Sequence, residues 1–455
     1  MKKFDAIVIG TGQAGPSLAA SLAENGLKTA IFEKAELGGT CVNTGCTPTK
    51  AYVASARRAY VASNSEELGV TVEGKVKVNL KKIKERKDKL IADSHSGLEK
   101  MFSSNEKVSL IRGKATFVNN TTVEVNGEQF SAEKIYINVG GRPRIPEGFQ
   151  KVNYLTNRSI LELEEIPEHL IIVGGGYVGL EFGQMFRRFG SKVTILERGE
   201  HLMKREDDDI AEIIAQVLKD SGIEVLLKSQ CISATEDDGE IKVSYHCEEG
   251  KKSISSPHVL VAAGRIPNTD DLGLENTDVV LDDHGFIKVN DELQTSAPNI
   301  WALGDCNGEG AFTHTAYNDF QIVNSHLFED QKRYLSDRFT CYAAYIDPAV
   351  ARVGLNEKEI KEKGIKAKVA MRPMKKIARA KEMGETTGLL KVFIEAETNK
   401  ILGATFVGPG ADEYIHTVID QMYAGNSYEV MRDAVHIHPT ISELIPTLLE
   451  NPKDL

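Results

Sequence analysis

The chain has 455 residues, which is more than one hydrophobic core supports, so we expect two or three domains. With 41% hydrophobic and 27% charged residues it is an ordinary globular protein, and its net charge of −11 argues against nucleic acid and anionic membranes as partners. No apolar run reaches the ~18 residues of a membrane span, and no secretory segment precedes the first strand. Six cysteines in such a chain indicate a reducing compartment, so we expect a cytoplasmic location.

A dinucleotide-binding motif opens the chain. A buried-strand pattern over Ala6–Ile9 leads into Gly10, Gly12 and Gly15 and then into a helical stretch. In this context Gly10 makes the turn, Gly12 lets the backbone approach a pyrophosphate, and Gly15 lets helix and strand pack. Glu33 ends the next strand, eighteen residues past Gly15, where a carboxylate accepts ribose hydroxyls. The alternative is a glycine-rich turn that binds no ligand.

Two cysteines five residues apart, Cys41 and Cys46, stand in the stretch Gly38–Lys50, GGTCVNTGCTPTK. Glycine supplies the backbone bend, and the loop is too short for a disulfide to stabilise the fold much. The pair therefore indicates a redox or soft-metal device. The alternatives are half a zinc site or two buried cysteines. No C-x2-C partner exists, and we expect no resident metal. The other cysteines are scattered singly: Cys231, Cys247, Cys306 and Cys341.

The dinucleotide motif recurs in the middle of the chain. A second strand pattern leads into Gly174, Gly176 and Gly179, and Glu197 again stands eighteen residues past the last glycine. Two such units in one chain are an internal repeat. Two dinucleotides together with a cysteine pair imply an electron relay from a nicotinamide through a flavin to sulfur.

The other segments connect these units or form a further domain. Residues 76–103 are lysine-rich with a helical period, which predicts a solvated amphipathic helix pair. Two matching phrases, 139–143 and 262–267, each follow a strand and look like domain crossings. Another strand leads to Asp305, a residue suited to a ribityl hydroxyl. From about residue 336 the glycine motifs are absent, which indicates a third domain.

These motifs resemble those of the group I flavoprotein disulfide reductases, the family of glutathione reductase, dihydrolipoamide dehydrogenase and mercuric reductase. The match runs from Phe4 to about Pro446 and rests on the cysteine stretch, on Ala302–Asp305 and on His438-Pro439-Thr440. Within the family the chain is most similar to the mercuric-reductase-like and dihydrolipoamide dehydrogenase-like members.

The resemblance implies an α/β fold with two Rossmann-like domains and a C-terminal α+β dimerisation domain. The FAD-binding domain would comprise residues 1–145 and 270–335, the NAD(P)-binding domain residues 146–269, and the dimerisation domain residues 336–455. It also implies a homodimer whose active site is shared between the subunits, because the histidine of one chain reaches the disulfide of the other. We expect the apolar run Ile437–Leu449 to supply surface for the partner.

Cofactor contacts follow from the same resemblance. FAD would lie on Gly10, Gly12, Gly15, Glu33 and Asp305, with His314 near the pyrimidine edge of the flavin or, equally, as a structural histidine. NAD(P)H would dock on Gly174, Gly176 and Gly179 beside Gly264, with Tyr177 as a movable lid over the flavin. Glu197 favours NADH because it repels a 2′-phosphate, whereas Arg198 and Lys204 stand where NADPH-dependent relatives place cations, with Arg205 beside them. We expect NADH to be preferred.

The implied mechanism passes hydride from NAD(P)H to the flavin, which then opens the Cys41–Cys46 disulfide. Cys46 would be the charge-transfer thiolate and Cys41 the thiol that meets the substrate, in a surrounding that lowers their pKa values. Lys50 resembles the lysine near the flavin N5, with Glu181 as its ion-pair partner. The alternative for Lys50 is an ordinary surface lysine.

The C-terminal phrase contains the proposed acid–base, His438, which the following proline keeps extended. Glu443 can orient one ring nitrogen while the other exchanges a proton with a substrate thiol. Thr440-x-x-Glu443 is also a capping box, and one carboxylate cannot fully serve both roles. We interpret Glu443 as the partner of the histidine, and Cys306 and His436 as bystanders.

The substrate is less well specified. Mercuric reductases end in a vicinal cysteine pair and carry tyrosine where His438 stands, whereas this sequence has no cysteine after Cys341 and no N-terminal metal-trapping domain. Two thiolates would still bind soft cations. We therefore predict an NAD(P)H-dependent reductase of a small disulfide or a soft metal ion. The alternatives are dihydrolipoamide dehydrogenase of a 2-oxo acid dehydrogenase complex and a flavin-bound redox sensor.

Overall fold

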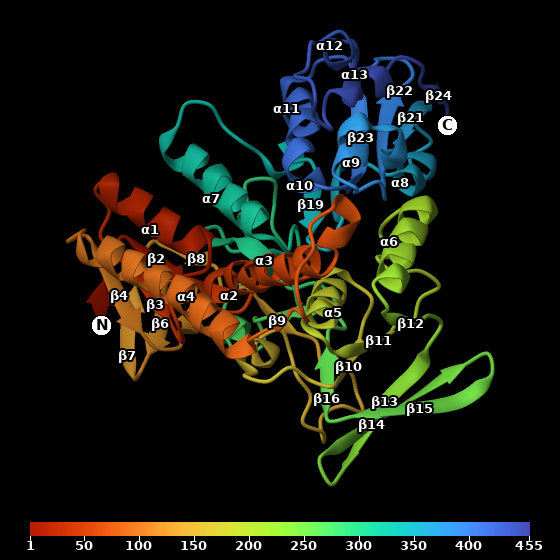
Figure 1. The fold of residues 1–455 in the computed structure, drawn as a ribbon. Coiled ribbons are helices and arrows are strands. Elements are labelled where there is room, and N and C mark those ends of the chain that lie inside the picture. Colours follow the sequence, from red (N-terminus) through yellow and green to blue (C-terminus); the bar gives the residue numbers. More distant parts are fainter.

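The computed structural model describes residues 1–455, and its N-terminal sheet is parallel with the strand order β18-β8-β2-β3-β4 (Figure 1). β2 and β3 are buried along their whole length, as expected for strands covered by helices on both faces. A smaller sheet, β1-β7-β6-β5, is attached to this unit. The strand bounds are β1 Lys2–Lys3, β2 Ala6–Ile9, β3 Thr29–Glu33, β4 Val108–Arg112, β5 Thr116–Asn119, β6 Thr122–Val125, β7 Glu128–Ser131, β8 Lys134–Ile137 and β18 Ile300–Ala302.

The middle unit repeats this strand–helix–strand arrangement in a second parallel sheet, β12-β11-β10-β16. An antiparallel three-stranded sheet projects from it (Figure 1, green). The two phrases interpreted as domain crossings pair with each other as β9 and β17. The bounds are β9 Gly141–Pro143, β10 His169–Val173, β11 Lys192–Leu196, β12 Glu224–Leu226, β13 Gln230–Asp237, β14 Glu240–Cys247, β15 Gly250–Ser256, β16 His258–Val261 and β17 Arg265–Pro267.

The C-terminal unit is a six-stranded antiparallel sheet, β19-β20-β23-β22-β21-β24, flanked by short helices. The bounds are β19 Cys341–Ala344, β20 Ala349–Gly354, β21 Ala367–Pro373, β22 Leu389–Glu395, β23 Ile401–Gly408 and β24 Lys453–Asp454. The helices here are α8 Glu357–Glu362, α9 Ala378–Glu382, α10 Ala411–Tyr414, α11 His416–Ala424, α12 Glu429–Arg432 and α13 Leu444–Leu448.

The apolar run Ile437–Leu449 does not form the outer surface that we expected from the sequence. Ile445 and Leu449 are fully buried in the core of the C-terminal unit, because α13 turns its apolar side chains inward. The exposed apolar side chains precede that helix: Val435 is 99% exposed and Ile437 80%. The apolar surface available to a partner is therefore shorter, and it lies immediately before His438.

Helices α1, α4, α5 and α6 of the first two units contact strands of their parallel sheets, whereas α3 packs on α4 and α5, and α7 packs on α1. The helix bounds are α1 Ala14–Glu24, α2 Gly39–Asn43, α3 Cys46–Ser63, α4 Leu80–Ser103, α5 Tyr177–Phe189, α6 Asp208–Asp220 and α7 Thr313–Phe328. The predicted helix pair over residues 76–103 is wrong, because one continuous helix, α4, occupies Leu80–Ser103. Asn79 caps the backbone N–H of Lys82, and no proline interrupts the helix that follows.

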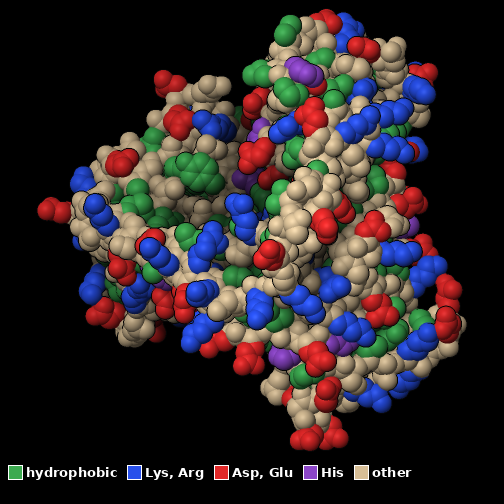
Figure 2. All heavy atoms as spheres, viewed as in Figure 1, with side chains coloured by type: hydrophobic (Ala, Val, Ile, Leu, Met, Phe, Trp, Pro, Cys, Tyr) green, Lys and Arg blue, Asp and Glu red, His purple; other side chains and the backbone are tan.

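Acidic and basic side chains are interspersed over the face shown in Figure 2. None of the helices combines the length and apolar character needed to cross a bilayer. The cysteine-bearing helix α3 lies between the N-terminal and middle units (Figure 1), and its side chains also reach the C-terminal unit, because Arg57 pairs with Asp347.

Candidate functional site

The two glycine turns have matching geometry. Gly10 has a φ of +106° and Gly174 a φ of +119°, values that side-chain-bearing residues rarely adopt. A Cβ on Gly15 would lie 2.1 Å from the Gly10 carbonyl oxygen, and one on Gly179 would lie 2.1 Å from that of Gly174. Each third glycine therefore lets its helix pack directly on the turn. Gly176, by contrast, faces open space at the start of α5, where a pyrophosphate fits against the helix N-terminus.

The two strand-terminal glutamates also have matching contacts. Glu33 accepts hydrogen bonds from the backbone N–H of Thr11 at 3.0 Å and from that of Ala35 at 2.8 Å. Glu197 accepts hydrogen bonds from the backbone N–H of Gly175 and from that of Gly199, both at 2.7 Å. Each carboxylate is thus fixed beside its glycine turn. These cradles fit two dinucleotides.

Cys46 is the first residue of α3, and Cys41 lies in α2 just before it. The thiol of Cys41 hydrogen-bonds Cys46, and this contact, the Thr313 hydroxyl and the charge of Lys50 together lower the pKa of Cys46 to about 6. The N-terminus of α3 also favours an anion at this position. The same cysteine contact, together with burial, raises the pKa of Cys41. At neutral pH the reduced pair therefore carries its negative charge on Cys46.

Thr313 was not identified from the sequence, although its hydroxyl lies 3.1 Å from the Cys46 sulfur. We expect Thr313→Val to raise the pKa of Cys46 by about one unit, because a hydrogen bond to a charged group is lost. The thiolate form exists above its pKa and disappears as the pH falls through it. The thiolate absorbance of the two-electron-reduced protein should therefore half-titrate near pH 6 in the wild type and at higher pH in the variant. An unchanged midpoint would contradict the contact.

Lys50 and Glu181 form the ion pair expected from the sequence, with Nζ and Oε2 2.6 Å apart. Glu181 is buried on α5, and its other oxygen accepts the N–H of Tyr345 at 2.8 Å. The Lys50 ammonium also lies 4.4 Å from the centre of the Tyr345 ring. Lys50 is on α3 and Tyr345 follows β19, so this cluster joins side chains from all three units.

Tyr177 begins α5 and packs in an aromatic cluster centred on Phe312. The ring centroids of Tyr177 and Phe312 are 5.5 Å apart, and Phe312 also stacks on Tyr342 and His314 at 5.6 and 5.4 Å. His314 bonds the Cys341 carbonyl through Nε2 at 2.8 Å. One of its ring nitrogens is therefore used within the chain, and a place for His314 beside the flavin stays a prediction.

Asp305 lies in a 3-10 turn directly after β18 and pairs with Arg265 at 3.2 Å. Gly264, the residue before Arg265, has a φ of +111°, and a Cβ added to it would have no atom within 4 Å. Asp305 and Gly264 therefore stand together where the two crossing segments meet. Arg198, Lys204 and Arg205 are exposed on the segment that follows β11.

His438 and Glu443 form the pair expected from the sequence, with Nδ1 and Oε2 2.8 Å apart. The Thr440 hydroxyl accepts the backbone N–H of Glu443 at 3.1 Å, so only one half of the capping box is made. The carboxylate is used by the histidine, which resolves the two competing roles. The His438 side chain is 76% exposed, whereas that of Glu443 is 12% exposed. His436 bonds the Ser442 carbonyl instead.

The structure does not bring His438 to the cysteines of its own chain. A cavity of about 670 Å³ separates α3 and α5 from the C-terminal unit, and its lining includes Pro439 and Arg57. Arg57 lies eleven residues after Cys46 on α3, which is roughly 16 Å along a helix. The residues that follow His438 therefore line the same cavity as the middle of α3, and the side-chain partner of His438 is Glu443 rather than a cysteine.

Comparison with known proteins gives the family. Residues 4–319 match the family described as pyridine nucleotide-disulphide oxidoreductase, and residues 340–449 match its dimerisation domain. The chain is 34% identical over 458 residues to the probable pyridine nucleotide-disulfide oxidoreductase RclA of Escherichia coli strain K12, covering 98% of this chain and 99% of that protein. It is 33% identical to a dihydrolipoyl dehydrogenase of Staphylococcus aureus, covering 97% of this chain and 94% of that one.

Two further relatives complete the comparison. A mercuric reductase of Lysinibacillus sphaericus is 33% identical, with 97% of this chain and 81% of that protein covered. A solved Cu(II) complex of the HOCl-induced flavoprotein disulfide reductase RclA from Escherichia coli superposes with a TM-score of 0.88 at 33% identity, covering 98% of this chain and 99% of that one. The dimerisation-domain match indicates a homodimer. The chain therefore belongs to the pyridine nucleotide-disulphide oxidoreductases, flavoproteins that use FAD and NAD(P)H.

Proposed function

We propose that this oxidoreductase passes electrons from NAD(P)H through FAD and the Cys41–Cys46 pair to a small disulfide or a soft metal ion. The observation that carries the proposal is the position of Cys46 as the first residue of α3, next to Cys41 and 3.1 Å from the Thr313 hydroxyl, in surroundings that lower its pKa. When bound, the flavin supplies the two-electron exchange between nicotinamide and sulfur. The proposal includes the roles given to the individual residues and a cytoplasmic location. It also includes three domains: an FAD-binding domain of residues 1–145 and 270–335, an NAD(P)-binding domain of residues 146–269, and a dimerisation domain of residues 336–455.

The side chains of this protein would handle charge and protons. Thr313 and Lys50 stabilise the Cys46 thiolate, and Glu181 fixes the lysine. His438 takes the proton of the Cys41 thiol, and the resulting thiolate attacks a substrate disulfide. This forms a mixed disulfide and releases one substrate thiolate, which takes the proton back from His438. Cys46 then attacks the Cys41 sulfur, which re-forms the internal disulfide and releases the second thiol.

The histidine in this scheme comes from the second subunit. His438 is exposed and backed by Glu443, it stands next to exposed Val435 and Ile437, and it forms no hydrogen bond with its own cysteine pair. A homodimer would cover these apolar residues and bring His438 to the partner's disulfide. A monomer would then contain no complete site.

A purified-protein assay separates the candidate substrates. We would measure NADH and NADPH oxidation with lipoamide, glutathione disulfide, Hg²⁺ and Cu²⁺. The His438–Glu443 acid–base pair favours a disulfide, whereas the Cu(II) complex of RclA and the mercuric reductase relative favour a soft metal. Selective turnover of lipoamide, reversible with dihydrolipoamide and NAD⁺, would instead support dihydrolipoamide dehydrogenase. If nothing is turned over although the cysteines oxidise and reduce, the protein is a redox sensor and the proposal is wrong.

We expect NADH to be preferred over NADPH by about tenfold in kcat/KM, because Glu197 meets the 2′ position of the ribose and repels a phosphate there. Its carboxylate is held rigidly by two backbone N–H groups, so it cannot swing away. Exposed Arg198 and Lys204 act in the opposite direction but are free to turn into solvent. Steady-state kinetics with both nucleotides test this, and a clear NADPH preference would overturn it.

A further inference from the structure

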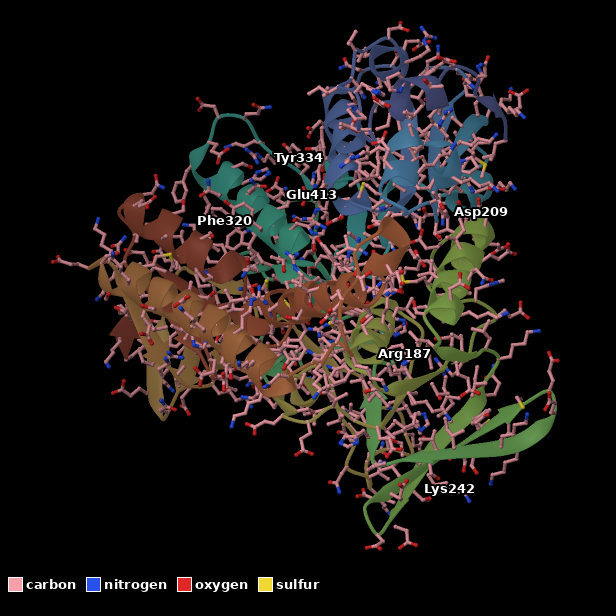
Figure 3. The ribbon with its side chains drawn as sticks, in the orientation of Figure 1. Arg187, Asp209, Lys242, Phe320, Tyr334 and Glu413 are labelled. Atoms are coloured by element: carbon pink, nitrogen blue, oxygen red, sulfur yellow. The ribbon has the colours of Figure 1, made fainter.

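A buried cluster of charges joins the middle unit to the dimerisation domain, far from the cysteines. Lys391 on β22 is 2% exposed, and its ammonium contacts Asp209 at 2.9 Å, Asp207 at 3.2 Å and Glu357 at 3.3 Å. Figure 3 labels Asp209 at the end of α6 that faces the dimerisation domain. Asp207 accepts in addition the backbone N–H of Glu357 at 3.1 Å.

A second set of contacts fixes the two residues just before Asp207. Arg352 on β20 and Asn356 each donate to the Arg205 carbonyl at 2.8 Å. Lys358 donates to the Glu206 carbonyl at 3.1 Å. Arg352 is 3% exposed and Asn356 2%, so these bonds are shielded from water. Every residue from 205 to 207 is therefore held by the dimerisation domain.

These residues form the end of the 197–207 loop, which connects β11 to α6. The start of the loop is fixed inside the middle unit: Glu197 bonds the glycine turn, and the Met203 N–H donates to the Gly175 carbonyl at 3.0 Å. Arg198 belongs to the part held by the middle unit, where the Gln230 amide donates to its carbonyl at 2.9 Å. Lys204 lies between the two fixed parts, and it is the cation whose position the dimerisation domain can change. The path of the loop from Lys204 onward therefore depends on contacts from a different domain.

We propose that the buried Lys391 cluster of the dimerisation domain positions the 197–207 loop and so sets the affinity of the enzyme for the adenosine half of the nicotinamide nucleotide. The proposal rests on the role proposed above for Glu197 at the ribose. Charges buried in this way are costly unless paired in good geometry, so removal of the cation leaves Asp207 and Asp209 repelling each other at the loop end. The loop then shifts, while the cysteine site stays unchanged.

The test compares NADH with reduced nicotinamide mononucleotide, which lacks the adenylate. In Lys391→Met we expect kcat/KM for NADH to fall about tenfold, with kcat retained at saturation. The value for the mononucleotide should stay at the wild-type level. Asn356→Ser is the milder variant, because serine still caps α8 but its shorter side chain does not reach the Arg205 carbonyl. It should lower the ratio of kcat/KM for NADH to kcat/KM for the mononucleotide, as Lys391→Met does. If Lys391→Met does not fold, Asn356→Ser provides the test.

The matched control is Arg188→Met, which removes another mostly buried ion pair to the C-terminal unit, with Asp347 at 2.8 Å, without touching the loop. It should lower Tm and leave the ratio unchanged. The inference would be overturned if Lys391→Met lowered kcat/KM equally for both nucleotides and Asn356→Ser left the ratio of the two kcat/KM values unchanged. The cluster would then be purely structural. Glu197→Ala tests the underlying role separately, because an unchanged ratio there would contradict the ribose contact itself.

Discussion

Replacing Cys46 by serine is expected to abolish the long-wavelength absorbance that a thiolate stacked on oxidised flavin gives after two-electron reduction. Cys41→Ser, which cannot form the disulfide, should show that band before any reduction, because the Cys46 thiolate would already lie beside oxidised flavin, and should lose it when the flavin is reduced. Both variants should lose disulfide reduction by on the order of a thousandfold or more, since each lacks one nucleophile of the relay. Anaerobic titration and steady-state assays measure the two effects.

The control for these variants is Cys231→Ser, which removes an exposed thiol on β13, outside the site. It should retain both band and turnover. Reduction of an artificial acceptor that takes electrons directly from flavin should survive in all three variants, which shows that flavin and nicotinamide still bind. Turnover of a disulfide by both active-site variants would contradict the proposed relay.

Mixing two inactive variants is expected to restore activity. In a dimer of Cys41→Ser with His438→Ala, a shared architecture places both mutations in one site and neither in the other. Random pairing makes half of the dimers mixed, each with one intact site, so an equal mixture that is unfolded and refolded should recover roughly a quarter of wild-type activity.

The separate refolded variants give the baseline, and a differently tagged pair shows how many mixed dimers form. If mixed dimers are present but inactive, each site uses the histidine of its own chain. That outcome would contradict the shared site.

The parts of the site that depend on local backbone geometry could be predicted from the sequence. The glycine turns, Glu33, Glu197 and the start of α3 lie within short continuous motifs whose spacing is fixed by a strand, a turn and a helix. The pairing of His438 with Glu443 could be predicted for the same reason, since five residues separate them. The family assignment rested on these motifs, and the comparisons confirm it.

Contacts between distant segments could not be predicted in this way. Thr313 is 267 residues from Cys46, and Tyr345 is 164 residues from the glutamate that accepts its N–H. A single threonine or lysine has no distinguishing spacing, so only the packing of the domains shows its role. The prediction of a helix pair over 76–103 was wrong because an apolar period does not show where a helix breaks. The prediction that Ile437–Leu449 is exposed was wrong because the same period does not show which neighbour covers an apolar face.

The cluster of Lys50, Glu181 and Tyr345 has a consequence for how the enzyme folds. Its members come from α3, α5 and the segment after β19, so the ion pair acquires its surroundings only after three separately folding units have docked. Secondary structure forms within each unit before that step, and docking of units takes milliseconds to minutes. During refolding from denaturant, catalytic competence must therefore emerge later than the far-ultraviolet circular dichroism signal, and the delay reports the time that docking takes.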